Sequence, residues 1–132
     1  MLAPEHLADL QRSGLSDTTI EALGFRTLRP GDIASAAHAE LTGVESAYIL
    51  PYPGLNGFHR LRLFPPIKDA KGHTRKYHQG HGSGTHLYIP PATRAALESD
   101  PNARVLITEG EKKAAKADQE GFSCLGIGGV WN

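Results

Sequence analysis

The chain has 132 residues, a formal net charge of zero and an apolar fraction of 39%. This length suits one domain, or a small domain with part of another, and the 15 glycines and 9 prolines predict many turns and short strands. The balanced charge excludes an overall field that attracts nucleic acid. The single cysteine, Cys124, excludes an internal disulfide and a cysteine-based zinc site, and its apolar neighbours predict a buried, unreactive thiol.

The sequence gives no sign of a membrane or export segment. No stretch approaches the roughly 20 apolar residues that a membrane-spanning helix needs. The first residues lack the basic and apolar regions of a signal peptide. We therefore expect a cytoplasmic protein with no membrane partner.

The charges are distributed unevenly along the chain. Residues 1–57 carry seven acids and three bases, whereas residues 58–104 carry eight bases and three acids. The middle third is therefore a candidate anion-facing surface. Ordinary charged surface is an equally good interpretation of the same pattern.

Residues 1–45 predict short helices. The first begins at Pro4, because proline suits the first helical turn. Ser16 is a good N-cap for a second helix over residues 17–23, which a glycine ends. A third start signal predicts a helix over residues 30–41.

Residues 46–103 predict an antiparallel β region. Four strands are expected to form a meander, over residues 46–51, 57–64, 74–78 and 85–89, with a short helix over residues 92–98 after them. Because alternate residues of a strand share a face, the second strand places Arg60 and Arg62 side by side on a sheet surface.

A basic group in this β region is a candidate surface for single-stranded nucleic acid. It consists of Arg60, Arg62, Arg75 and Lys76, with Tyr77 and Phe58 interleaved. Such surfaces combine cations that neutralise the backbone with aromatic rings on which bases stack. An exposed sheet face with ordinary polar alternation is the alternative interpretation.

Four histidines of the same region invite comparison with a metal site. They are His73, His78, His81 and His86, whose spacings match no standard zinc framework. A glycine-rich loop that carries polar histidines is the simpler interpretation. If a metal does bind there, His78 and His81 are the first pair to test.

Residues 104–132 predict a β-α-β unit. The apolar run over residues 105–108 is typical of a parallel strand buried on both faces. A helix over residues 111–120, rich in lysine, alanine and glutamate, and a second strand over residues 122–127 complete the unit. Since two parallel strands do not make a finished sheet, we expect the chain to be part of a longer polypeptide.

The expected fold class is therefore an α+β region followed by the start of an α/β domain. The α+β region consists of short helices and an antiparallel meander. The α/β domain is represented by its first β-α-β unit and is expected to be truncated.

The sequence LITEGEKKA, from Leu106 to Ala114, resembles the first motif of Toprim domains, in which an acid and a glycine close the first strand. It is most similar to the version found in phage and plasmid primases and primase-helicases. Residues 125–132 resemble the second strand of the same group and its glycine turn, which here contains Gly126, Gly128 and Gly129. Residues 52–64, Lys76-Tyr77 and residues 87–91 show a looser resemblance to the region that precedes the Toprim motif in such proteins.

The resemblance implies a Rossmann-like domain with a Mg²⁺-dependent site for nucleotidyl transfer. Glu109 takes the position of the catalytic and metal-binding acid. Gly110 would let a phosphate or metal approach the backbone, and Lys112 and Lys113 would contact phosphates at the start of the helix. The alternatives are that Glu109 and Glu111 only charge the first helical turn, and that the two lysines are solvated.

This chain departs from the Toprim pattern in one respect. Toprim domains carry an Asp-x-Asp motif on a later strand, and no such motif follows Glu109. Because Mg²⁺ prefers several oxygen ligands, we expect this chain alone to bind the ion weakly and to catalyse nothing measurable.

The resemblance finally implies a biological context. The chain would be the N-terminal part of a primase-like replication protein of a phage, plasmid or other mobile element. Its partners would be a single-stranded DNA template and nucleotides, with a helicase domain or protein as a further candidate. The alternatives are a non-catalytic module that binds single-stranded nucleic acid, and a Toprim nuclease or topoisomerase.

Overall fold

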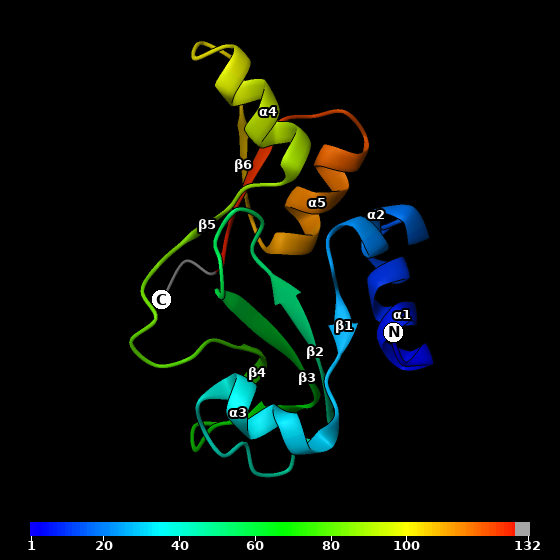
Figure 1. Cartoon of the computed structure of the whole chain (residues 1–132). Helices are drawn as coiled ribbons and strands as arrows, with labels where there is room; N and C mark the ends of the chain where they lie inside the picture. The colour runs from blue at the N-terminus through cyan, green and yellow to red at the C-terminus, as the bar shows by residue number, and fades with distance from the viewer. Residues whose placement is uncertain (129–132) are drawn as a thin grey trace.

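The short elements that the sequence predicts form two small β-sheets with helices around them (Figure 1). The computed structural model describes residues 1–128. The elements of the N-terminal half are α1 (Pro4–Arg12), α2 (Asp17–Ala22), β1 (Arg26–Thr27), the 3₁₀ turn η1 (Pro30–Asp32), α3 (Ile33–Ala37), β2 (Ser46–Pro51) and β3 (His59–Lys68). They are followed by β4 (Thr74–His78), β5 (Leu87–Tyr88), α4 (Pro91–Ser99), β6 (Leu106–Glu109), α5 (Glu111–Gln119) and β7 (Cys124–Ile127).

The first sheet is antiparallel, with the strand order β1-β2-β3-β4. The predicted meander of β2, β3 and β4 is confirmed, and the short strand β1 extends it at the edge of β2. Leu61 and Leu63 lie on one face of β3 and pack with Ile33 and Ala37 of α3. The opposite face carries Arg60 and Arg62 and lies toward α1 and α5.

The helices of the N-terminal segment are confirmed, but the third is shorter than predicted. It ends at Ala37 because His38 adopts the left-handed conformation, with a φ of 51°. The last carbonyl groups of α3 are bound by two imidazoles of the first sheet. His59 Nε2 lies 2.9 Å from Ala36 O, and His78 Nε2 lies 2.9 Å from Ala37 O.

The second sheet has the order β5-β7-β6. Strands β6 and β7 are parallel, with α5 between them in the chain, so they form a β-α-β unit. The expectation that residues 85–89 complete the meander is wrong, because β5 pairs antiparallel with β7. Tyr88 lies opposite Gly126 in this pairing, and a glycine there leaves room for Tyr88 Cβ and for Ala114 of α5.

Two further expectations about this sheet are wrong. Strand β6 is not buried on both faces, since Leu106 is 57% and Ile107 is 68% exposed. The reason is its place at the edge of a three-stranded sheet, beside β7 alone. Gly126 lies within β7 and not in a turn, Gly128 follows the strand, and Gly129 lies outside the described residues.

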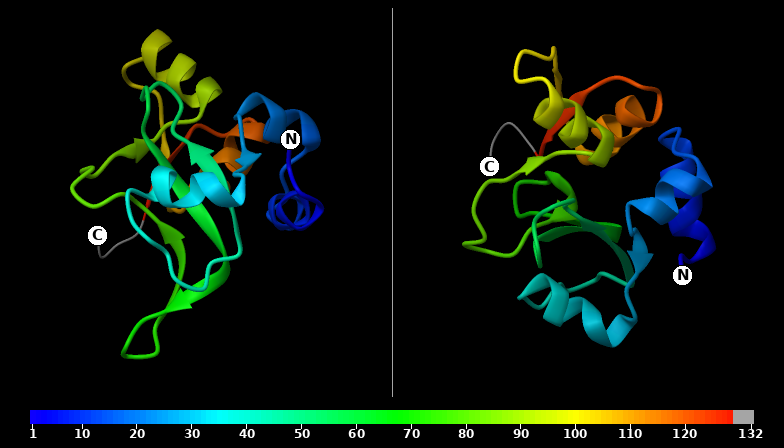
Figure 2. Two further views of the ribbon diagram at one scale, coloured as in Figure 1. Left: turned by 60° about the horizontal axis from the view of Figure 1, so that its bottom comes forward. Right: turned by 45° about the horizontal axis from the view of Figure 1, so that its top comes forward.

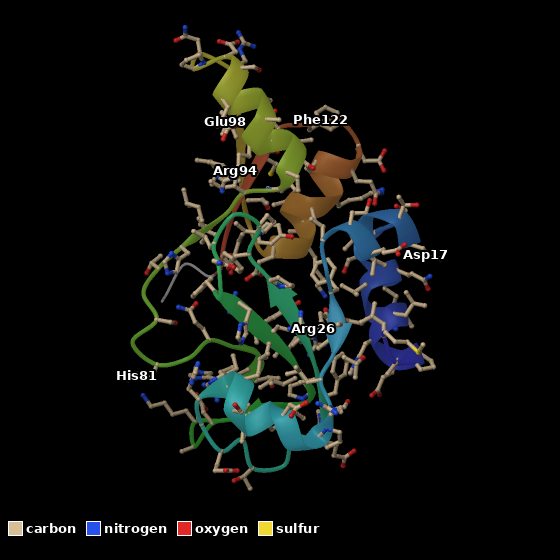
Figure 3. All side chains as sticks on the ribbon, in the orientation of Figure 1. Asp17, Arg26, His81, Arg94, Glu98 and Phe122 are labelled. Atoms are coloured by element: carbon tan, nitrogen blue, oxygen red, sulfur yellow. The ribbon has the colours of Figure 1, made fainter. Side chains whose placement is uncertain are left out.

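The helices surround the first sheet on different sides (Figure 2). Helices α1 and α2 lie along one side, and α3 lies at the end farthest from α4. Arg94 reaches from α4 to the turn between β2 and β3, where its guanidinium donates to Pro53 O over 3.4 Å (Figure 3). Within residues 1–128, none of the helices is both long enough and apolar enough to cross a membrane.

Candidate functional site: a cationic cleft at the start of α5

A cleft of about 610 Å³ lies where α1, β3 and β4 meet the start of α5. Its lining consists of Asp9, Ser13, Arg60, Arg62, Lys76, Tyr77, Glu109, Gly110, Glu111, Lys112, Lys113 and Gly128. Five of these side chains are cationic and three are acidic, so the lining has an excess of positive charge. The cleft therefore brings Arg60, Arg62 and Lys76 of the predicted basic group together with Glu109, the predicted catalytic acid.

Arg60 is the first of two buried arginines in the cleft. Its Nη1 donates to Glu111 Oε1 over 2.7 Å, and the hydroxyl of Tyr52 donates to the same oxygen over 2.7 Å. Burial, and then the charge of Glu111, raise the pKa of Tyr52, so its hydroxyl remains a donor. This carboxylate therefore fixes the position of the guanidinium, and Arg60 is buried, which contradicts the alternative interpretation of an exposed sheet face.

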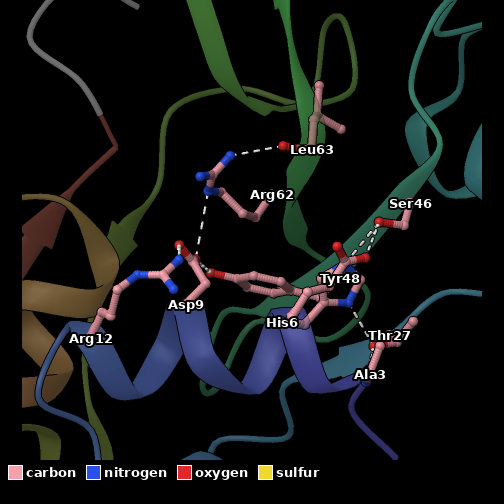
Figure 4. Close-up of polar contacts among 10 residues, drawn as sticks. Ala3, His6, Asp9, Arg12, Thr27, Ser46, Tyr48, Arg62 and Leu63 are labelled. Atoms are coloured by element: carbon pink, nitrogen blue, oxygen red, sulfur yellow. Dashed lines mark hydrogen bonds and ion pairs between the residues drawn. The ribbon is translucent and has the colours of Figure 1, made fainter.

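Arg62 is the second buried arginine, and it lies beside Asp9 of α1 (Figure 4). Its Nε is 3.6 Å from Asp9 Oδ2, and its Nη1 donates to Leu63 O over 2.8 Å. Asp9 Oδ2 also accepts from the hydroxyl of Tyr48 over 2.8 Å and from Lys112 Nζ over 3.1 Å. One carboxylate of α1 thus accepts from Tyr48 of the sheet and from Lys112 of α5, and it lies within ion-pair distance of Arg62.

The pKa values of this group follow from burial and from the hydrogen bonds. Burial on its own would raise the pKa of Asp9, but the Tyr48 hydrogen bond and the charge of Lys112 bring it below the usual 3.8. Burial, and then the charge of Asp9, raise the pKa of Tyr48. The cleft therefore contains an ionised Asp9 and a protonated Tyr48 at neutral pH.

Tyr77 of β4 lies at the centre of the cations. Its ring centroid is 5.4 Å from Arg60 Cζ, 5.5 Å from Arg62 Cζ and 5.6 Å from Lys112 Nζ. An aromatic ring attracts cations through the negative charge of its face. Tyr77 therefore helps to hold three positive groups close together, in spite of their mutual repulsion.

The N-terminus of α5 opens into the same cleft. Gly110 has a φ of 101°, which favours glycine, and no side chain of residues 1–128 caps the helix at this position. The free backbone N–H groups of a first helical turn, together with the helix dipole, favour an anion. Lys113 is exposed beside them, whereas Lys112 is half-buried against Asp9.

Glu109 is exposed at the carboxyl end of β6, next to this helix start. Within residues 1–128, no group of three or more His, Cys, Asp or Glu side chains is placed to hold a metal ion. Asp9 and Glu111 are bound to cations, so Glu109 is the carboxylate of the lining that remains open to a ligand. The described residues therefore fit Mg²⁺ only as a partial site with one protein ligand, and no catalytic step follows from them.

The cleft does not include every residue that the sequence singled out. Arg75 is exposed on β4 outside the lining, and Phe58 packs beneath the turn between β2 and β3. His78 is buried against α3, His73 pairs with Asp69, and His86 bonds to Ser83 O. The described part of the chain therefore gathers no metal-binding set from the four histidines.

Two residues of the lining were missed by the sequence reasoning. Asp9 lies on α1, and Ser13 is the C-cap residue that follows this helix. A signal was available in the spacing of His6, Asp9 and Leu10. Residues three or four positions apart lie on the same face of a helix, so the two polar residues share the buried face of the leucine. The local sequence does not indicate that the buried face of α1 contacts Lys112, which is 103 positions after Asp9.

Compared with known proteins, the chain matches no protein-family model, no curated protein and no solved structure. The resemblance to Toprim domains therefore depends on the motif residues of the sequence alone.

Proposed function

We propose that this chain is the strand-binding part of a primase-like, Toprim-type replication protein of a mobile element. The cleft holds a single nucleic-acid strand by its phosphates, and Glu109 lies next to the bound strand. The observation that carries the proposal is the meeting of Arg60, Arg62, Lys76, Lys112 and Lys113 with Glu109 in one cleft.

The composition of the cleft supports binding of an extended anion. Phosphate oxygens accept hydrogen bonds, and the lining supplies guanidinium, ammonium and backbone N–H donors. Its volume of about 610 Å³ is in the range of ligand sites, so the cleft has room for a short segment of one strand. The exposed Lys76 and Lys113 are the cations that are best placed to meet a ligand first.

The proposal is tested by fluorescence anisotropy of a labelled single-stranded oligonucleotide of about 15 nucleotides, which covers the usual site size. We expect affinity to fall with salt, by a slope of about 0.7 for each phosphate that is neutralised. The double variant Lys76→Ala/Lys113→Ala is expected to bind about tenfold or more weakly and to have a salt slope lower by about 1.4.

The matched control is Lys68→Ala/Lys71→Ala, which removes the same charge from exposed lysines outside the cleft. We expect it to retain most of the affinity and the full salt slope of the wild type. Equal losses in the two double variants would show attraction by general charge and would overturn the assignment of the cleft.

A non-catalytic binding module is the second candidate, and one observation favours it. Glu109 is the single carboxylate of the lining that is not engaged by a cation, within residues 1–128. The two candidates differ in their response to Mg²⁺. In a primase-like protein, Mg²⁺ strengthens strand or nucleotide binding and Glu109→Gln removes this gain, whereas a non-catalytic module shows no gain in either form.

A further inference from the structure

The aromatic rings near the cleft are already in contact with protein groups. Tyr77 is half-buried and faces three cations at 5.4 to 5.6 Å. Phe58 is half-buried, with its ring centroid 4.7 Å from that of Tyr52 and 4.2 Å from that of His86. Within residues 1–128, Tyr77 is the single aromatic residue of the cleft lining, and Phe58 lies outside it. Neither ring therefore offers the open face on which a base would stack.

The groups that remain open in the cleft are hydrogen-bond donors. Arg60 and Arg62 line it, and their side chains are each 10% exposed. The first turn of α5 adds backbone N–H groups that no side chain of the described residues caps. The exposed Lys76 and Lys113 add ammonium donors, so the lining favours a ligand that supplies acceptor oxygens.

The acceptors of the cleft are mostly in use. Asp9 accepts from Tyr48, Lys112 and Arg12, and Glu111 accepts from Tyr52 and Arg60. Base edges present both donors and acceptors, and reading them needs both kinds of partner. Phosphate oxygens only accept, and therefore match a lining whose open groups are donors.

We propose that the cleft recognises the phosphodiester backbone of the strand and makes no base contacts, so that its ligand is defined by phosphate alone. This inference rests on the proposed function and names the part of the strand that is bound. Tyr77 acts as a positioning residue, because it holds Arg60, Arg62 and Lys112 close together and does not stack on a base.

The test compares three labelled ligands of equal length with the full chain at one salt concentration. They are oligothymidylate, the same backbone with abasic sugars, and a thymine peptide nucleic acid that has bases but no phosphates. We expect the abasic strand to bind within about threefold of oligothymidylate, since stacking of even one base would change affinity by at least about fivefold. The peptide nucleic acid is expected not to bind.

The outcomes separate the two levels of the argument. If oligothymidylate binds and the abasic strand is weaker by more than about threefold, base contacts exist and this inference fails, while the proposed function stands. Binding of the peptide nucleic acid overturns it in the same way. If oligothymidylate itself does not bind, the proposed function fails, and the inference with it.

A variant of Tyr77 gives an independent readout. Tyr77→Leu keeps a half-buried apolar side chain but removes the ring that faces the cations. We expect it to weaken oligothymidylate and the abasic strand by the same factor. A loss confined to oligothymidylate would identify Tyr77 as a stacking residue and contradict the proposal, whereas no loss on either ligand would exclude its positioning role.

Discussion

Arg60 Nη1 lies 2.7 Å from Glu111 Oε1, and the two side chains are only 10% and 3% exposed. Arg60 belongs to β3 of the first sheet, and Glu111 is the first residue of α5 in the β-α-β unit. The pair therefore connects the first sheet to the β-α-β unit, at the cleft that both residues line. Because each charge has lost much of its contact with water, each depends on the other for compensation.

Removal of one member of this pair is expected to destabilise the protein strongly. Arg60→Met or Glu111→Leu leaves a buried charge without its partner, which costs about 3–5 kcal/mol of unfolding free energy. The double variant removes both charges and is expected to recover most of that loss. Urea unfolding of the wild type, the two single variants and the double variant measures the difference.

The exposed pair of Lys116 and Glu120 on α5 provides the control. Its side chains are 39% and 51% exposed, and exposed ion pairs contribute little to stability because water screens them. Lys116→Met and Glu120→Leu should therefore have small effects. A double Arg60→Met/Glu111→Leu variant as unstable as the worse single variant would show that the pair is not the cause.

Gly126 is predicted to tolerate no side chain. A Cβ built there would lie 3.1 Å from Ala114 Cβ, 3.1 Å from Gly110 O and 3.2 Å from Tyr88 Cβ. These atoms belong to the backbone or to the first carbon of a side chain, so they cannot move without displacing α5 or β5. We expect Gly126→Ala to lower the unfolding free energy by about 1–3 kcal/mol, measured by thermal unfolding.

Gly31 is the matched control for this substitution. No heavy atom lies within 4 Å of a Cβ built at Gly31, and its φ is not positive. Gly31→Ala is therefore expected to leave stability nearly unchanged. Equal losses at the two positions would refute the packing argument for Gly126.

Local patterns in the sequence predicted much of the fold. The alternation in β3 correctly separated Leu61 and Leu63 from Arg60 and Arg62, because successive side chains of a strand point to opposite faces. The N-cap Ser16 was predicted correctly, since its hydroxyl oxygen accepts from the backbone N–H of Thr19 over 3.2 Å. Features of this kind depend on residues a few positions apart.

The features that depend on distant residues were not predictable in this way. The pairing of β5 with β7 requires Tyr88 to meet Gly126, and the burial of Arg62 requires Asp9 from α1. The same alternation of polar and apolar residues arises in two cases. In one the arginine lies on an exposed sheet face, and in the other it is buried beside a carboxylate partner. The sequence therefore predicted the cationic residues of the candidate site. It did not predict that acidic side chains would pair with the arginines, or that the arginines would be buried.

His6 is predicted to make stability depend on pH near neutrality. It is fully buried, its Nδ1 lies 2.7 Å from Thr27 Oγ1, and burial lowers its pKa below 6.5. The unfolded chain therefore takes up a proton at a higher pH than the folded chain, and stability decreases as pH falls through 6.5 toward the lower folded value. His6→Gln should remove this slope, measured by urea unfolding between about pH 7 and pH 5.

The exposed His81 supplies the control for this measurement. His81→Gln is expected to keep the wild-type slope. If His6→Gln and the wild type lose stability in parallel over this range, the burial of His6 is not the source of the pH dependence.

Asp9 is predicted to govern stability at lower pH. Its folded pKa lies below 3.8, so its contribution is complete above that value and is lost as pH falls through the folded pKa. Asp9→Asn should be less stable than the wild type at neutral pH, because Arg62 and Lys112 lose a nearby charge. The difference should shrink as pH falls through the folded pKa of Asp9, where the carboxyl group takes up a proton. Urea midpoints across this range measure it, with Glu21→Gln on the exposed side of α2 as control. A difference that stays constant with pH would mean that Asp9 acts by shape and hydrogen bonding, without a contribution from its charge.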